Sequence, residues 1–121
     1  VTDMSFGDVY IVNNSKITMG HAGVYNIQFS AQCDNTDNTP QSLYIWLKKN
    51  GSNVAESATK LVIPKDQAQV MSVTFNVEAA ANDYYELAWQ STNAGCYLLA
   101  ENASGNIPAI PSVICSVNQV R

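Results

Sequence analysis

Apolar and polar residues alternate along most of this chain, and that alternation restricts what it can fold into. In residues 23–33, "GVYNIQFSAQC", almost every second residue is apolar, and the residues between are mostly amides or serine. A period of two is the period of a β-strand with one buried face. Such strands favour antiparallel sheets packed on a core. The same alternation occurs in residues 43–48, 70–78, 83–91 and 112–120.

The phase of each alternating segment predicts which side chains enter the core. Phe29 and Leu47 are the two positions where we expect full burial, and their neighbours at spacing two share the same face. The complete inward-facing set is Tyr25, Ile27, Phe29, Ala31, Leu43, Ile45, Leu47, Met71, Val73, Phe75, Val77, Tyr85, Leu87, Trp89, Val113, Cys115 and Val117.

Three large aromatic residues, Tyr44, Trp46 and Tyr84, fall on the opposite, outward-facing phase. Aromatic side chains on an exposed sheet face usually mark a contact site. We favour a subunit interface for these three residues. Carbohydrate stacking and partial burial under a loop are the alternatives.

The segments between the strands carry turn signals. Asn50-Gly51 predicts a tight hairpin. A polar loop covers residues 33–41, Pro64 interrupts any strand around it, and residues 102–111 form a long loop with two prolines. Residues 78–83, "EAAAND", are too few to hold a helix alone. Shorter strands are expected at residues 8–12, 16–19 and 96–100. About eight short strands with regular turns predict an all-β sandwich or barrel.

Composition limits the class of protein further. The 121 residues suit one domain, residues 1–121. Charged residues make up 13% and the net charge is -4, with six basic residues and no cluster beyond Lys48-Lys49, so nucleic-acid binding is not expected. We find no transmembrane run or signal peptide in this sequence, and expect no membrane insertion. Because it opens at Val1 without Met, we expect a fragment of a longer chain or a processed product.

The three cysteines are Cys33, Cys96 and Cys115, an odd number without a Cys-x-x-Cys pair. We expect them to be free, small, buried apolar residues, with a disulfide between two of them as the alternative. Free thiols suit a chain that matures in a reducing compartment, or a particle assembled in one.

The sequence does not predict a catalytic residue, a cofactor site or a metal site. The carboxylates lie mostly in turns or on polar faces, and the single histidine, His21, precedes a turn glycine. Residues 34–38, "DNTDN", resemble half of a calcium loop, but an Asx-turn loop is favoured because the later glycine and glutamate are missing. Asn13, Asn50 and Asn102 each begin an Asn-x-Ser sequon, and we expect them to be bare turn residues.

Four segments, in order, carry a family resemblance. They are "ITMGHAGVYNIQFSAQ" (17–32), "LYIWLKKNGSNV" (43–54), "AANDYYELAW" (80–89) and "IPSVICSVNQV" (110–120). Together they resemble the jelly-roll domain shared by tumour necrosis factor and the globular head of complement subcomponent q. They are most similar to the version of that domain found in phage tail fibres and other virion structural proteins. The resemblance spans residues 8–120.

The resemblance implies an antiparallel jelly-roll β-sandwich of ten strands that assembles as a homotrimer. It implies a non-enzymatic structural role in a phage virion, as a tail fibre or spike module or a capsid decoration protein in contact with other virion proteins. A receptor- or glycan-binding head domain, which would contact a host surface, is one alternative. An extracellular complement-like recognition protein of a cellular organism is the other. We expect the family's first strand, before residue 8, to be missing or clipped in this sequence, and its calcium ligands and receptor loops cannot be placed here.

Overall fold

A computed structural model describes residues 9–121 as ten β-strands. The strand expected before residue 8 lies outside the described residues. The strands are β1 Val9–Val12, β2 Lys16–Met19, β3 Gly23–Asn35, β4 Gln41–Lys49, β5 Ser52–Asn53, β6 Thr59–Ile63, β7 Gln67–Ala79, β8 Tyr84–Ser91, β9 Cys96–Leu98 and β10 Val113–Gln119. Within the described range, no helix is long and apolar enough to cross a membrane.

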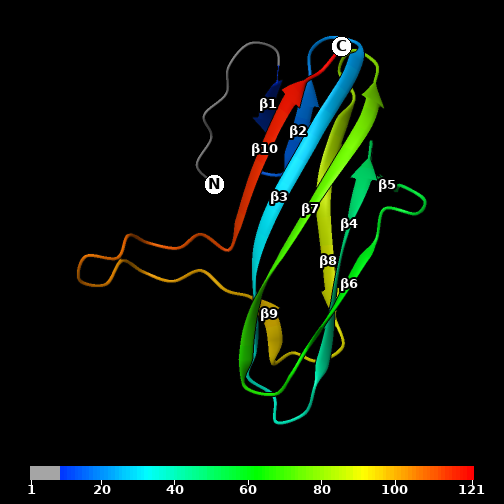
Figure 1. Ribbon diagram of the computed structural model, residues 1–121. Helices are drawn as coiled ribbons and strands as arrows, with labels where there is room; N and C mark the ends of the chain where they lie inside the picture. The colour runs from blue at the N-terminus through cyan, green and yellow to red at the C-terminus, as the bar shows by residue number, and fades with distance from the viewer. Residues whose placement is uncertain (1–8) are drawn as a thin grey trace.

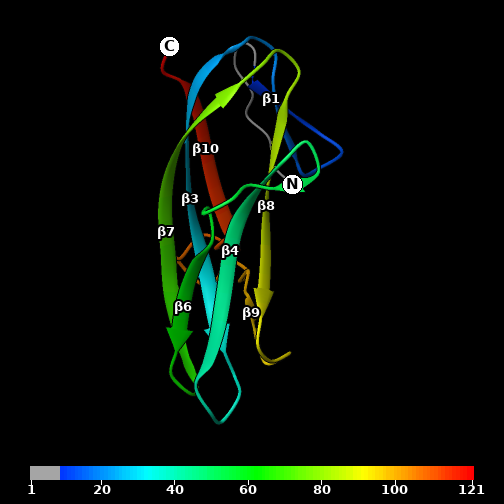
Figure 2. The ribbon, with the colours of Figure 1, turned by 90° about the vertical axis from the view of Figure 1, so that its right-hand side faces the viewer.

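The strands form two antiparallel sheets that stack as a β-sandwich (Figures 1 and 2). The six-stranded sheet has the order β1-β2-β8-β4-β5, with β6 also paired to β4. The four-stranded sheet has the order β10-β3-β7, with β9 also paired to β3. Strands β3 and β7 pair along their whole length, from Gly23 opposite Ala79 to Asn35 opposite Gln67. The predicted all-β, antiparallel architecture is therefore confirmed.

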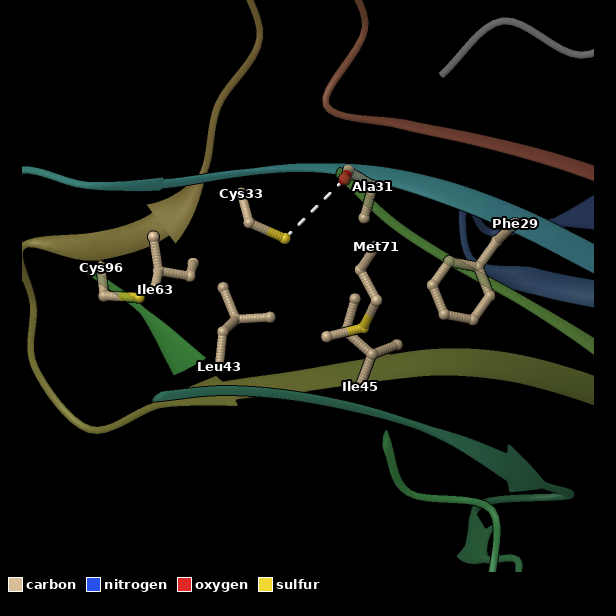
Figure 3. Packing of buried hydrophobic residues seen from close by; sticks show 8 residues of the cluster. All are labelled: Phe29, Ala31, Cys33, Leu43, Ile45, Ile63, Met71 and Cys96. Atoms are coloured by element: carbon tan, nitrogen blue, oxygen red, sulfur yellow. Dashed lines mark hydrogen bonds between the residues drawn. The ribbon is translucent and has the colours of Figure 1, made fainter. Parts of the chain in front are cut away.

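The core lies between the two sheets and follows the phase read from the sequence. Phe29 is 3% exposed and Leu47 is 0% exposed, so both expected core positions are confirmed. One cluster, shown in Figure 3, contains Phe29, Ala31, Cys33, Leu43, Ile45, Ile63, Met71 and Cys96. A second contains Ile17, Met19, Tyr25, Ile27, Leu47, Ala79 and Tyr85.

The predicted turn chemistry is present. Asn50 and Gly51 both have positive φ, 49° and 87°, as a two-residue type I′ hairpin requires. Pro64 separates β6 from β7, and residues 78–83 form the end of β7 and a turn instead of a helix. Two strands were not predicted, β5 and β6, and β3 continues to Asn35 into the expected loop.

Two residues of the expected core are exposed, which corrects the prediction. Trp89 is 44% exposed although Tyr85 and Leu87, on the same face of β8, are buried or half-buried. Cys115 is exposed as well. Both side chains line a cleft between the sheets. The alternation therefore assigned both side chains to the correct face of their strands, but the facing sheet does not cover them.

Candidate interaction surfaces

The predicted interface residues lie on the outer face of the six-stranded sheet. Tyr44 and Trp46 are neighbours on that face of β4, opposite Gln90 and Ala88 of β8. Tyr84 lies at the start of β8, beyond the Lys48–Glu86 pair. The structure thus brings Tyr44 and Trp46 together and leaves Tyr84 apart. We call Tyr44, Trp46, Ala88 and Gln90 the aromatic face.

Each of the three aromatic rings has a polar neighbour and is half-buried. The indole N–H of Trp46 donates to Asn53 Oδ1 at 2.9 Å. Lys60 Nζ lies 5.9 Å from the centre of the Tyr44 ring, and Lys16 Nζ lies 4.8 Å from that of Tyr84. Distances within about 6 Å allow a cation–π attraction. The rings are therefore held in place before any partner arrives.

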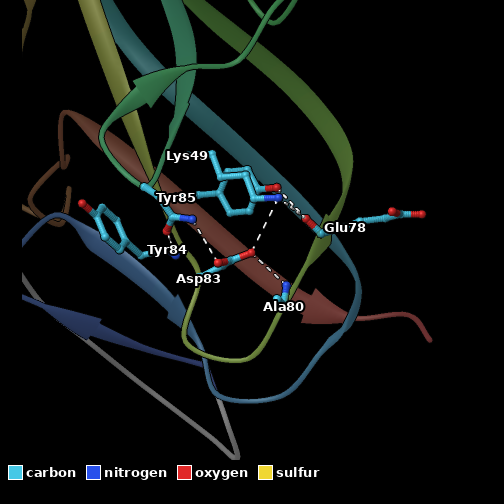
Figure 4. A network of polar contacts seen from close by, with 7 residues as sticks. Lys49, Glu78, Ala80, Asp83, Tyr84 and Tyr85 are labelled. Carbon is cyan, nitrogen blue, oxygen red and sulfur yellow. Dashed lines mark hydrogen bonds and ion pairs between the residues drawn. The ribbon is translucent and has the colours of Figure 1, made fainter.

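A polar network beside Tyr84 fixes the end of the β4–β5 hairpin (Figure 4). The Asp83 carboxylate accepts from Asn50 Nδ2 at 2.9 Å and from the backbone N–H of Ala80 at 2.8 Å, and Lys49 Nζ lies 3.6 Å away. The hydrogen bond from Asn50, together with that from Ala80, lowers the pKa of Asp83. These contacts tie the hairpin to the loop before β8, so they are structural in role.

The outer face of the four-stranded sheet carries mainly amides and hydroxyls, with a shallow hollow of about 290 Å³ at its centre, and we call it the amide face. Asn26 Nδ2 donates to Asn76 Oδ1 at 3.0 Å, and Gln28 Nε2 donates to Asn26 Oδ1 at 2.9 Å. No residue in its three central rows is charged. The rows, read across β10, β3 and β7, are Asn118–Asn26–Asn76, Ser116–Gln28–Thr74 and Ile114–Ser30–Ser72.

The alternation in residues 23–33 predicts that one face of β3 is polar, but it does not predict that this face is a contact surface. The signal was available, because the outward residues of residues 24–32, 72–76 and 114–118 include no charge. What the sequence did not provide was the pairing, which aligns the three uncharged stretches side by side.

An open apolar cleft of about 370 Å³ lies between the sheets at the edge where β10 faces β8. Strand β2 pairs with β8 only at Tyr84 and Tyr85, so the rest of β8 has a described neighbour on one side alone. Within residues 9–121, β10 likewise pairs only with β3. The apolar lining residues are Ile11, Ile17, Phe29, Ile45, Leu87, Ala88, Trp89, Leu98, Val113 and Cys115, with Asn14, Ser15 and Ser112 at the polar margin.

The "DNTDN" segment forms the Asx-turn loop that the sequence favoured. The backbone N–H of Asp37 donates to Asn35 Oδ1 at 3.0 Å, and the buried Asn35 amide donates to the carbonyls of Thr39 and Ile63. Hydrogen bonds from Thr39 and then Gln41 to the Asp37 carboxylate lower its pKa. The carboxylate oxygen is thus engaged within its own loop, which does not favour a calcium site.

The candidates for acid–base chemistry or metal binding include one histidine, His21, and the carboxylates. His21 lies in the turn between β2 and β3, where its carbonyl accepts the Tyr25 hydroxyl at 2.6 Å. In the part of the chain that the structure describes, no three His, Cys, Asp or Glu side chains gather closely enough to hold a metal ion. The interaction surfaces are the features that the geometry offers for function.

Known families add nothing to this geometry: no family model matches the chain, and no curated protein matches it significantly.

Proposed function

We propose that this chain is a non-enzymatic structural module of a phage virion, a tail fibre or spike domain or a capsid decoration protein. It assembles as a homotrimer of jelly-roll domains of the tumour necrosis factor and complement-q type, and it acts through surface contacts with other virion proteins. The resemblance of the four sequence segments motivates the family.

The path of the chain supports the jelly-roll assignment. Strand β2 belongs to the six-stranded sheet, β3 to the four-stranded sheet, β4 to the six-stranded sheet again, and β7 and β8 repeat the crossing. Repeated crossing between two antiparallel sheets is the pattern by which a jelly roll winds. The pattern supports the assignment without specifying how many copies assemble.

The amide face is the observation that carries the proposal of assembly. Buried centres of protein interfaces are depleted of charge, because an ion loses its water there. In the three rows from Asn118 to Ile114, every side chain that β10, β3 and β7 present is uncharged. The charged residues of the described chain lie outside these rows. Such a face can be covered by a second copy without desolvating any ion.

Two isosteric substitutions test which face packs the subunits. Gln28 is at the centre of the amide face, and Gln90 is at the aromatic face; both are exposed. We expect sedimentation velocity to find a trimer, and Gln28→Glu to weaken it while Gln90→Glu does not. The reverse result would move the interface to Tyr44 and Trp46. A stable monomer of the parent chain at micromolar concentration would overturn the proposal.

A glycan- or receptor-binding head at a fibre tip is the second candidate function. The adjacent Tyr44 and Trp46 rings favour it, because flat aromatic side chains can stack on sugar rings. A glycan array probed with the soluble protein separates the two roles. Binding that Trp46→Ala abolishes would favour the head domain in the virion, or the extracellular recognition protein in a cellular organism.

A further inference from the structure

The loop between β9 and β10 stands away from the body of the protein. Residues 102–111 extend beyond the sheets on the side of β10, as Figure 1 shows in orange; we call them the arm. Every arm residue is exposed except Ile110, which is half-buried, and Ile107 is 61% exposed.

The arm is held together by its own backbone. Glu101 and Ile110 exchange two hydrogen bonds of 2.9 and 2.8 Å, and Ser104 and Ile107 exchange two of 2.9 Å. Gly105, at the turn, has a φ of 57°. An isolated two-stranded ribbon is at best marginally stable in water. We therefore expect the exposed arm to pack against another surface.

The cleft has the complementary character. Its lining is mainly apolar and includes the exposed indole of Trp89, and among residues 9–121 no charged side chain lines it. The arm has no charged residue either. Docking one into the other would therefore bury apolar area without desolvating an ion. The edges of β8 and β10 that have no strand partner within residues 9–121 flank the cleft, and such edges accept an extended chain.

A chain's own arm is poorly placed to fill its own cleft. Leu98 and Ser112, which lie before and after the arm in the chain, line the cleft themselves. From there the arm extends away from the sheets (Figure 1). A second copy supplies the missing arm, and copies related by rotation can exchange arms around a closed ring.

We propose that the arm of one copy docks into the apolar cleft of a neighbouring copy, with Ile107 entering beside Trp89. The occupant is thus a second copy of this chain. The inference rests on the proposed homotrimer and adds a named contact to it.

The first test is a charge at the tip of the arm. Ile107 is exposed in the single chain, so Ile107→Asp should leave the fold unchanged by circular dichroism. We expect it to raise the protein concentration at half-dissociation at least about tenfold. Val62→Asp is the matched control, because Val62 is 53% exposed and lies on β6 of the six-stranded sheet, outside both the cleft and the amide face; it should leave the trimer unchanged.

The second test uses the exposed thiol of Cys115 in the cleft. With Ile107→Cys, a short bismaleimide should link chains into dimers and trimers on a denaturing gel. Adding Cys115→Ser should abolish the ladder, and Val62→Cys should not produce one.

The outcomes separate this inference from the proposed function. A trimer that Ile107→Asp leaves intact, without the crosslinked ladder, overturns the arm contact alone. A link formed only within one chain also overturns it, because the arm would then cover its own cleft. A parent chain that stays monomeric at micromolar concentration overturns both proposals.

Discussion

The three cysteine thiols occupy different environments. Cys33 and Cys96 are buried, and Cys115 is exposed. Burial raises the pKa of each thiol, and for Cys115 the apolar cleft has this effect although part of its surface is open. We expect a thiol reagent to modify one group rapidly in the folded, dissociated chain and three after denaturation without reductant. One group after denaturation would mean a disulfide, against the predicted free state.

Phe29 shows how much one core residue contributes. It is 3% exposed and packs against Phe75, with 6.3 Å between the ring centres. Phe29→Ala should lower the free energy of unfolding by about 3–5 kcal/mol, through lost transfer energy and a cavity. Urea denaturation measures the change, with the exposed Thr74→Ala as control. A loss below about 1 kcal/mol would contradict the assigned core.

Trp46 and the buried Leu47 are consecutive residues of β4, so their side chains point to opposite faces of the sheet. Its ring is half-buried on the outer face, and its indole N–H is already satisfied by Asn53. We therefore expect Trp46→Ala to keep the fold by circular dichroism. We expect the variant to bind the proposed virion particle, or another partner, more weakly by about 2 kcal/mol, which is typical of an interface hot spot. Outright unfolding would show that the ring is structural.

At the level of elements, the β4–β5 hairpin depends on Asn50. This residue adopts a positive φ of 49°, donates to Asp83 and accepts from the backbone N–H of Tyr84 at 3.0 Å. Asn50→Ala removes both side-chain bonds and strains the turn, so it should cost about 1–3 kcal/mol. Ser52→Ala, an exposed position in the same hairpin, is the control for a general loosening of the hairpin.

Asn50→Ala should also change how the stability of the folded protein depends on pH. Asp83 has a lowered pKa in the folded state, so its contribution to stability is present above the unfolded carboxyl pKa of about 3.9 and is lost as pH falls through the folded value. Asn50→Ala should raise the pKa of Asp83 towards its ordinary value, as carboxyl chemical shifts in an NMR titration would show. An unchanged pKa would assign the lowering to Ala80 and Lys49 instead.

Sequence alternation predicted the long elements well, and its failures have physical causes. Strands β3, β4, β7, β8 and β10 were found because each buries one face only. The β6 segment was missed because Leu61, Val62 and Ile63 are apolar in succession and show no period. For Trp89, parity gave the correct face but could not tell whether the other sheet reaches over it. The amide face and the cleft both arise from pairing between distant strands, which no local pattern contains.

At the scale of the whole molecule, the amide face, the cleft and the arm are the surfaces that the proposed assembly would cover, so folding and association should be coupled if the chain is a trimer. Unfolding of a trimer that dissociates is opposed by mass action, and its melting temperature rises with protein concentration. For a chain of this length we expect a rise of about 3–5 °C for each tenfold increase in concentration, measured by scanning calorimetry. Gln28→Glu, which puts a charge at the centre of the amide face, should remove most of this dependence, whereas Gln90→Glu should keep it. A parent melting temperature that does not change with concentration would show that each chain folds and functions alone.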